Sequence, residues 1–144
     1  MDAWREAVVR EAHEWLGTRY GHAQDRKGVA VDCGMLLVRV YVDLGLAPPF
    51  DPRPYPAQWF LHRTEERYLG WIARYCDRVE DHQVQPADIA LFRFGRCAAH
   101  GAIVVNNRQM IHAYMSAGRV ELRDRTDKMP HGKLDSHWSP RVAA

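Results

Sequence analysis

The first residues of the chain alternate between apolar and charged side chains with the period of a helix. Over 2–16 the apolar set is Trp4, Val8, Ala12 and Trp15, and the charged set is Arg5, Glu6, Arg10 and Glu14. This spacing predicts an amphipathic helix whose apolar set packs on a core and whose charged set faces water. Asp2 is suited to begin the helix and Gly17 to end it.

The most apolar stretch, VDCGMLLVRVYVDLGL over 31–46, is predicted to form a second helix. Its valines would suit a strand, but about twelve residues pass without a breaker, which exceeds the usual length of a buried strand. The apolar residues at helical spacing are Leu37, Val40, Tyr41 and Leu44. Asp32 is a typical N-cap and Gly45 a typical helix stop, so Cys33 is expected in the first turn.

The rest of the pattern predicts one more helix, followed by strands. We expect a loop at 18–31, irregular proline-rich structure at 48–56 and a polar helix at about 57–75. Short apolar runs between turn residues predict strands at 87–94, 101–105, 109–114 and 119–123. The polar tail, 124–144, is expected to be irregular. This order is typical of an α+β domain with helices packed on an antiparallel sheet.

The composition fits one domain over 1–144, with its core at about 2–123. A chain of 144 residues that is 47% hydrophobic can bury a substantial core. Its formal net charge of +2, without a Lys/Arg-rich run, gives no support for nucleic-acid binding. No apolar stretch reaches the roughly 18 residues of a membrane span, and the charged N-terminus lacks the apolar centre of a signal peptide. We therefore expect cytoplasmic synthesis and no membrane insertion.

Candidate chemistry begins at Cys33. A thiol becomes a strong nucleophile as the thiolate, which a helix N-terminus and a nearby imidazolium both favour. The predicted second helix supplies the first of these, and histidines in the predicted strands are candidates for the second. The other cysteines, Cys76 and Cys97, are expected to be small buried side chains. Three cysteines are too few and odd in number for a disulfide framework.

His100 and His112 lie on consecutive predicted strands. A two-residue turn at 106–107 would place the two imidazoles on opposite faces of the sheet. A three-residue loop over 106–108 would instead pair His112 with Ala102 and place both imidazoles on one face. Such loops favour a residue that tolerates the left-handed conformation, such as Asn, so we predict the three-residue register. The opposite face would then carry Ile103, Val105 and Ile111.

Five motifs in this order resemble those of the NlpC-type family of cell-wall cysteine peptidases, which have a compact papain-like fold. They are GTRYG at 17–21, VDCGMLLVRVY at 31–41, QPADIALFRF at 85–94, AHGAIVV at 99–105 and MIHA at 110–113. No single motif is specific, so their order and spacing carry the resemblance, over roughly 12–122. The segments QWFLHRTEERYLGW and FRFGR, at 58–71 and 92–96, are similar to the branch encoded in phage tail operons and gene-transfer-agent clusters.

The resemblance implies roles for individual residues. Cys33 would be the nucleophile, His100 the general base and His112 the group that orients His100. Tyr20 would lie near the oxyanion or the substrate. Asp32 reads first as a helix cap, although family members use this Asp to bind the free amine of the substrate.

Further positions bear on the substrate. Gly34 stands where the family usually has a Ser that contacts the peptide donor side, and Met35 stands where it has Gly. Arg19 replaces the usual Pro before the tyrosine, and Ala87 replaces a Gly in the 85–94 motif. None of these changes removes a reacting group. His22, close to Tyr20 in the sequence, is a candidate for lining the cleft.

Simpler interpretations remain for the other histidines and for metal binding. The sequence Cys97-Ala-Ala-His100 could suggest zinc, but no second Cys or His pair completes four ligands, so we expect neither a metal nor a cofactor. Taken alone, His112 would be read as a core histidine with satisfied hydrogen bonds. Five further histidines are expected at the surface or in loops: His13, His62, His82, His131 and His137.

We therefore expect a cysteine peptidase or amidase that acts through Cys33 and its two histidines. By resemblance, its substrate is the stem peptide of bacterial peptidoglycan, cut at the γ-D-glutamyl to diaminopimelate bond. A wall-binding domain does not fit in this length, so we expect targeting by a partner such as a phage tail protein. Two alternatives stay open: a papain-like amidase or acyltransferase with another substrate, and a non-enzymatic tail-assembly protein that retains the fold.

Overall fold

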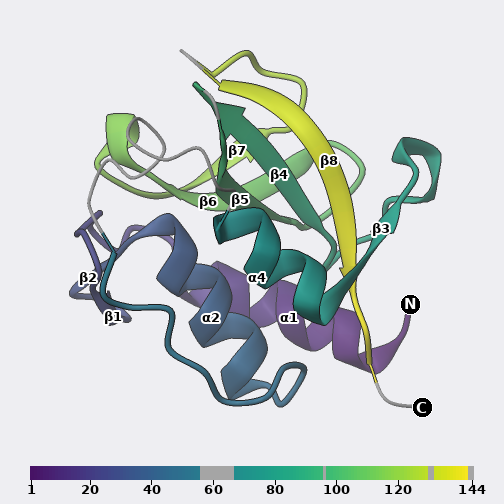
Figure 1. The fold of residues 1–144 in the computed structure, drawn as a ribbon, viewed down its shortest axis with the longest axis horizontal. Helices are drawn as coiled ribbons and strands as arrows, with labels where there is room; N and C mark the ends of the chain where they lie inside the picture. Colours follow the sequence, from purple (N-terminus) through teal and green to yellow (C-terminus); the bar gives the residue numbers. More distant parts are fainter. Residues whose placement is uncertain (56–66, 96, 130–131, 143–144) are drawn as a thin grey trace.

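The computed structural model describes residues 1–55, 67–95, 97–129 and 132–142. Within these ranges, helices α1 (Ala3–Glu14), α2 (Cys33–Asp43) and α4 (Arg67–Tyr75) pack against a curved antiparallel sheet (Figure 1). The sheet has the strand order β3-β8-β4-β5-β6-β7. Its strands are β3 (Cys76–Val79), β4 (Ile89–Phe94), β5 (Cys97–Val104), β6 (Gln109–Tyr114), β7 (Arg119–Asp124) and β8 (Gly132–Pro140). This architecture confirms the predicted α+β class. None of the helices in the described ranges is long and apolar enough to cross a membrane.

Helix α1 forms where the periodicity predicts it, but one of its charged residues lies on the buried side. Val8, Ala12 and Trp15 belong to the main core, as predicted. Arg5 is also buried, and its Nη1 lies 2.8 Å from Oδ1 of Asp88, which contradicts its predicted exposure. The reason is the pairing: a buried guanidinium is tolerated when a carboxylate balances its charge. The two residues are 83 positions apart, beyond the reach of a helical pattern.

Helix α2 confirms the predicted boundaries of the apolar stretch. Asp32 is its N-cap, and the Asp32 carboxylate accepts a hydrogen bond from the backbone N–H of Met35 at 2.9 Å. The helix ends just before Gly45, whose φ of 75° suits a residue without a Cβ. Six apolar residues from Met35 to Tyr41 are buried against the sheet and α1. This packing holds the first turn, and with it Cys33, against the sheet.

The hairpin between β5 and β6 has the predicted three-residue register. Ile103 pairs with Ile111 and Val104 with Met110. Asn106 stabilises the loop, because its side-chain oxygen accepts hydrogen bonds from the backbone N–H groups of two following residues. Ile103, Val105 and Ile111 join the main core beneath the helices, as predicted. The other face packs a second apolar cluster that includes Ala102, Val104, Met110 and Tyr114.

The prediction of an irregular tail is wrong for residues 132–140. Strand β8 lies inside the sheet, where it pairs with β3 on one side and β4 on the other. Its sequence, GKLDSHWSP, lacks the apolar alternation of a typical strand. Backbone pairing on both edges compensates for this weak pattern, since it satisfies the N–H and C=O groups of the segment. Strand β3 was likewise not predicted.

Three further segments agree wholly or in part with the predicted elements. The predicted loop at 18–31 contains a short ribbon of two strands, β1 (Asp25–Arg26) and β2 (Ala30–Val31). The proline-rich segment is irregular through residue 55, as predicted. Of the predicted helix at 57–75, the part at 67–75 is confirmed as α4, and the rest falls in 56–66, outside the described residues.

Candidate active site

Cys33 lies in the first turn of α2, beside strand β5. Its side chain is half-buried, and its Sγ lies 3.8 Å from the carbonyl oxygen of Ala99, to which the thiol donates a weak hydrogen bond. Ala99 immediately precedes His100 in the chain. The thiol therefore meets the first of the two conditions set by the sequence, a helix N-terminus, and it contacts the strand that carries the candidate base.

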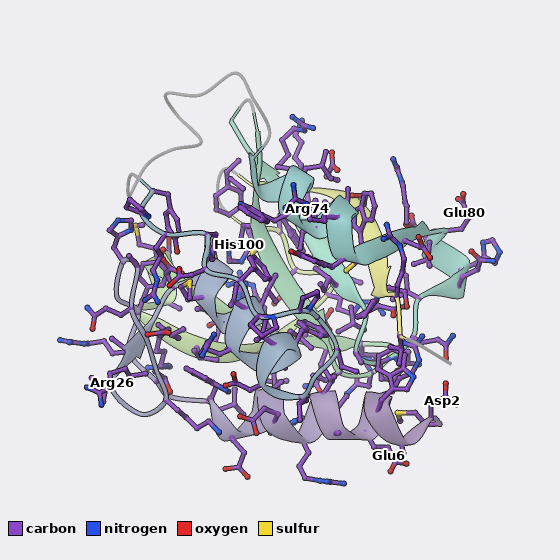
Figure 2. The ribbon with its side chains drawn as sticks, turned by 60° about the horizontal axis from the view of Figure 1, so that its bottom comes forward. Asp2, Glu6, Arg26, Arg74, Glu80 and His100 are labelled. Carbon is purple, nitrogen blue, oxygen red and sulfur yellow. The ribbon has the colours of Figure 1, made fainter. Side chains whose placement is uncertain are left out.

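His100 and His112 are in direct contact across β5 and β6. Nε2 of His100 lies 2.7 Å from Nδ1 of His112, which is hydrogen-bond distance. Figure 2 places His100 in the interior of the molecule, and its exposed fraction is 4%. The ring of Phe94 stacks on His100 at 5.3 Å, and the ring of Tyr114 stacks on His112 at 5.0 Å. The three-residue register thus brings the two imidazoles together, as predicted.

Burial shifts the pKa of both imidazoles in the same direction. The pKa of His112 is lowered to about 3, mainly by desolvation and then by the positive charge of Arg123. Desolvation also lowers the pKa of His100 well below its usual value, and neighbouring His112 adds to this effect. Since a buried imidazolium is costly, both rings are neutral near pH 7.

Glu121, which was not predicted from the sequence, contacts the second histidine of the pair. His112 pairs with Glu121 in the β6–β7 ladder, and Nε2 of His112 lies 2.8 Å from Oε2 of Glu121. Nη1 of Arg123 donates to the same oxygen at 3.1 Å. The β6–β7 register would have been the signal, because the segment RVELR alone indicates only a strand.

The Asp32 carboxylate caps α2 next to Cys33 and also makes two further contacts. Its Oδ2 accepts hydrogen bonds from the backbone N–H of Ala23, at 2.7 Å, and from the hydroxyl of Tyr55, at 2.5 Å. The carboxylate is 2% exposed, so protein groups already occupy both of its oxygens. The capping role is confirmed, and binding of a substrate amine would require the Tyr55 hydroxyl to move aside.

Tyr20 and His22 approach the same region from the segment after α1. Burial raises the pKa of Tyr20, and the neighbouring Cys33 and Asp32 raise it further, so the phenol stays protonated and can donate a hydrogen bond. His22 is exposed, and its ring meets the edge of Tyr55 at 5.5 Å.

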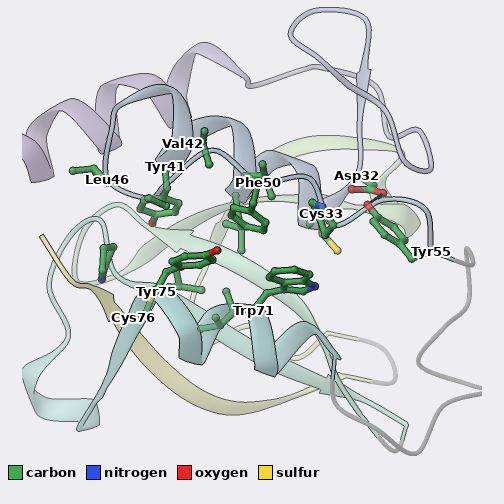
Figure 3. A pocket seen from close by; sticks show the side chains of 18 of the residues that line it. Asp32, Cys33, Tyr41, Val42, Leu46, Phe50, Tyr55, Trp71, Tyr75 and Cys76 are labelled. Atoms are coloured by element: carbon green, nitrogen blue, oxygen red, sulfur yellow. Dashed lines mark hydrogen bonds between the residues drawn. The ribbon is translucent and has the colours of Figure 1, made fainter.

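An apolar cavity of about 90 Å³ opens beside Cys33. Figure 3 shows it between α2, the segment that follows α2, and α4, with Cys33 and Trp71 among the side chains that line it. Five predicted site residues line it: Tyr20, His22, Asp32, Cys33 and Gly34. The rest of the lining is largely aromatic and aliphatic, and includes the stacked rings of Phe50 and Trp71, 5.0 Å apart. His100 and His112 are not part of this lining.

The remaining cysteine and histidine predictions have mixed outcomes. Cys76 is buried as predicted, and burial raises the pKa of its thiol to about 12; the Cys97 side chain lies outside the description. His13 and His82 are exposed as predicted. The prediction that His137 lies at the surface or in a loop is wrong: it is 3% exposed in β8, where its Nδ1 lies 3.0 Å from Asp81 Oδ1. His62 and His131 lie outside the described residues. Among the described residues, no group of three or more His, Cys, Asp or Glu side chains is arranged to hold a metal ion.

Solved structures with the same fold define the class of this domain. A Bacillus cereus protein of the NlpC/P60 family has a TM-score of 0.70 at 18% identity, over 96% of this chain and 40% of its own. NlpC1 from Trichomonas vaginalis has a TM-score of 0.67 at 22% identity, over 94% of this chain and 44% of its own. RipB, a Mycobacterium tuberculosis peptidoglycan hydrolase, has a TM-score of 0.61 at 19% identity, over 98% and 66%. The fold is thus the papain-like α+β fold of these proteins.

The sequence itself identifies the family. The model of the NlpC/P60 family matches residues 17–139, which is most of the chain. The chain therefore belongs to the NlpC/P60 family. It spans less than half the length of the first two structures described above. A search of curated proteins found no significant match.

Proposed function

We propose that this chain is a cysteine peptidase or amidase that hydrolyses stem peptides of peptidoglycan, with Cys33 as nucleophile. The observation that carries the proposal is the position of the Cys33 thiol. It lies at a helix N-terminus, and its Sγ is 3.8 Å from the carbonyl oxygen of Ala99, the residue before His100. RipB, which shares the fold, is named a peptidoglycan hydrolase, as is SagA. The family membership supports the same substrate class.

The proposed reaction begins with the proton transfer from the thiol. His100 is neutral, so it can accept the Cys33 proton as the sulfur attacks the amide carbonyl. The oxyanion would be stabilised by the Cys33 backbone N–H and the Tyr20 hydroxyl. The imidazolium of His100 then protonates the leaving amine, and water hydrolyses the thioester to release the acid and restore the thiol.

The proposed scissile bond is the one between γ-D-glutamate and diaminopimelate. A free amine next to this bond would be recognised by Asp32, after the Tyr55 hydroxyl leaves the carboxylate. Gly34 leaves the donor side without the hydroxyl of a serine. These features make Tyr55 part of the proposed substrate selection, since its hydroxyl competes with the amine for one carboxylate oxygen.

Digestion of purified peptidoglycan tests the proposal. Wild type, Cys33→Ala and Cys76→Ala are incubated with muropeptides, and the products are identified by mass spectrometry. Wild type and Cys76→Ala should release the same fragments, because the Cys76 thiol is buried and protonated. Cys33→Ala should fold and release none. Equal digestion by Cys33→Ala would remove Cys33 from the mechanism.

The apolar cavity favours a second candidate, a papain-like amidase or acyltransferase with an acyl substrate. A peptide with several charges would leave this cavity unfilled, whereas an acyl chain would bury apolar surface in it. Hydrolysis of acyl thioesters is the discriminating assay. Turnover that rises with chain length, without release of muropeptide fragments, would favour this second candidate over the first.

Association with phage tail proteins remains a prediction from the similarity of two segments. Part of the first, 58–66, and Arg96 of the second lie outside the described residues. A non-enzymatic tail-assembly protein would have an ordinary thiol at position 33. Iodoacetamide labelling at neutral pH tests this. A catalytic Cys33, with a helix N-terminus and with His100 to accept its proton during alkylation, should react faster than a model thiol, and equal rates would favour the non-enzymatic alternative.

A further inference from the structure

A chain of polar contacts continues from His100 to the edge of the sheet. Nε2 of His100 meets Nδ1 of His112 at 2.7 Å, and Nε2 of His112 meets Oε2 of Glu121 at 2.8 Å. Arg123 donates to the same Oε2 at 3.1 Å. Both ring nitrogens of His112 are therefore engaged, and each by a different partner. The tautomers of the two rings decide which nitrogen carries each proton in this chain of contacts.

We propose that Glu121 is a positioning residue: it selects the tautomer of His112, and through it the tautomer of His100. The inference rests on the proposed function for its catalytic consequence. Its structural part, which states which imidazole nitrogen carries each proton, does not depend on the substrate.

The direction follows from the hydrogen-bonding capacity of each group. An ionised carboxylate only accepts, so Nε2 of His112 must carry a proton toward Glu121. His112 is neutral, so its Nδ1 has a lone pair and must accept from Nε2–H of His100. His100 is neutral as well, which leaves its Nδ1 without a proton. Because Nε2 is engaged by His112, Nδ1 is the nitrogen left to accept the Cys33 proton in the proposed reaction.

The alternative tautomers show why the carboxylate matters. Without an acceptor next to Nε2, His112 could carry its proton on Nδ1 and donate to Nε2 of His100. His100 would then hold its own proton on Nδ1 and could not accept one from Cys33. Glu121 disfavours this state, because it would leave a lone pair of His112 facing a carboxylate in a site that is 0% exposed at His112.

Arg123 and the strand geometry hold the carboxylate in place. The Glu121 and Arg123 side chains are about one-fifth exposed, and the guanidinium also lies over the Tyr114 ring at 5.4 Å. Tyr114 in turn stacks on His112. One oxygen of Glu121 is thus aimed at His112 from an adjacent strand by an ion pair, rather than by chance contact of a mobile surface side chain.

Nitrogen-15 NMR of the labelled full chain tests the structural part directly, since imidazole nitrogens with and without a proton have distinct chemical shifts. In wild type near pH 7 we expect a bare Nδ1 and a protonated Nε2 on His100. Glu121→Ala should give a mixture of tautomers. A protonated Nδ1 in wild type, or an unchanged tautomer in Glu121→Ala, would overturn the proposal. This measurement stands even if peptidoglycan proves not to be the substrate.

Steady-state kinetics test the catalytic consequence. Glu121→Ala should lower kcat by about 10-fold or more, with little change in KM. The loss cannot exceed the roughly 10²–10⁴-fold that general acid–base catalysis contributes in total. Glu121→Gln should recover part of the loss, because its amide oxygen can still accept from Nε2–H. The matched control is Leu122→Ala, an exposed neighbour on the same strand, which should leave kcat unchanged. Equal kcat for Glu121→Ala and wild type, or equal losses for Glu121→Ala and Leu122→Ala, would contradict the positioning role.

Discussion

His100 and His112 are almost fully shielded from water, and this shielding governs the protonation of the whole site. Burial lowers the pKa of both rings, so neither carries a positive charge near pH 7. The Cys33 thiol donates to the carbonyl of Ala99, and the candidate base that follows in the chain, His100, is a neutral imidazole rather than an imidazolium. The burial of His100 therefore favours proton transfer from the thiol during attack over a preformed thiolate–imidazolium ion pair.

The same shielding predicts how stability depends on pH. The folded-state pKa of His112 is about 3, against 6.5 for an ordinary histidine. Between these values the unfolded chain binds a proton that the folded chain excludes, so stability should fall as pH drops from about 6.5 toward 3. His100 acts in the same direction. Above pH 6.5 this loss of stability is absent, because the imidazole is then neutral in both the folded and the unfolded state.

Urea unfolding over this pH range measures the effect. His112→Asn should flatten the pH dependence, although it also lowers stability at pH 7. The control is His82→Asn, which changes an exposed histidine and should retain the wild-type slope. If wild type and His112→Asn lose stability in parallel between pH 6.5 and 4, the buried imidazole is not the source of the acid sensitivity.

At the scale of elements, strand β8 supports the candidate base through β4. Gly132 of β8 pairs with Phe94 of β4, and the Phe94 ring stacks on His100. A Cβ at position 132 would lie 2.2 Å from Cε1 of Phe94, so the strands leave no room for a larger residue there. The segment that the sequence indicated as an irregular tail is thus two contacts away from the imidazole.

Gly132→Ala should therefore displace the Phe94 ring and loosen the packing on His100. Overpacking of this kind costs about 1–3 kcal/mol, and we expect kcat to fall as well because the imidazole loses a fixed neighbour. Gly70→Ala on α4 is the control: nothing lies within 4 Å of the added Cβ, so stability should hold or rise slightly. Thermal unfolding and kcat are measured for both variants. Identical behaviour of the two would show that Phe94 is not needed for His100.

At the scale of the whole molecule, the sequence predicts what local patterns determine. The period of the apolar stretch and the capping residue place Cys33 in the first turn of α2. The asparagines of the hairpin loop predict the register that joins His100 to His112. Glu121 and β8 were not predicted, because each depends on which strand lies next to which. A single sequence shows turns and periods, but strand order arises from packing of the complete chain.

The buried pair of Arg5 and Asp88 is the clearest contact of this long-range kind. Arg5 on α1 bonds to Asp88, which directly precedes β4, and also to Ser139 of β8, so it ties the first helix to two strands of the sheet. Asp88 is 1% exposed, and Arg5→Met would leave its carboxylate buried without a counter-charge, at a cost of about 3–5 kcal/mol.

Arg5→Met with Asp88→Asn should cost less than the sum of the single changes, because the uncompensated charge is removed. Arg10→Met is the control, since Arg10 is exposed on the same helix. Urea unfolding of all variants gives the coupling energy; an Arg5→Met no less stable than Arg10→Met would mean that α1 is held by its apolar face alone.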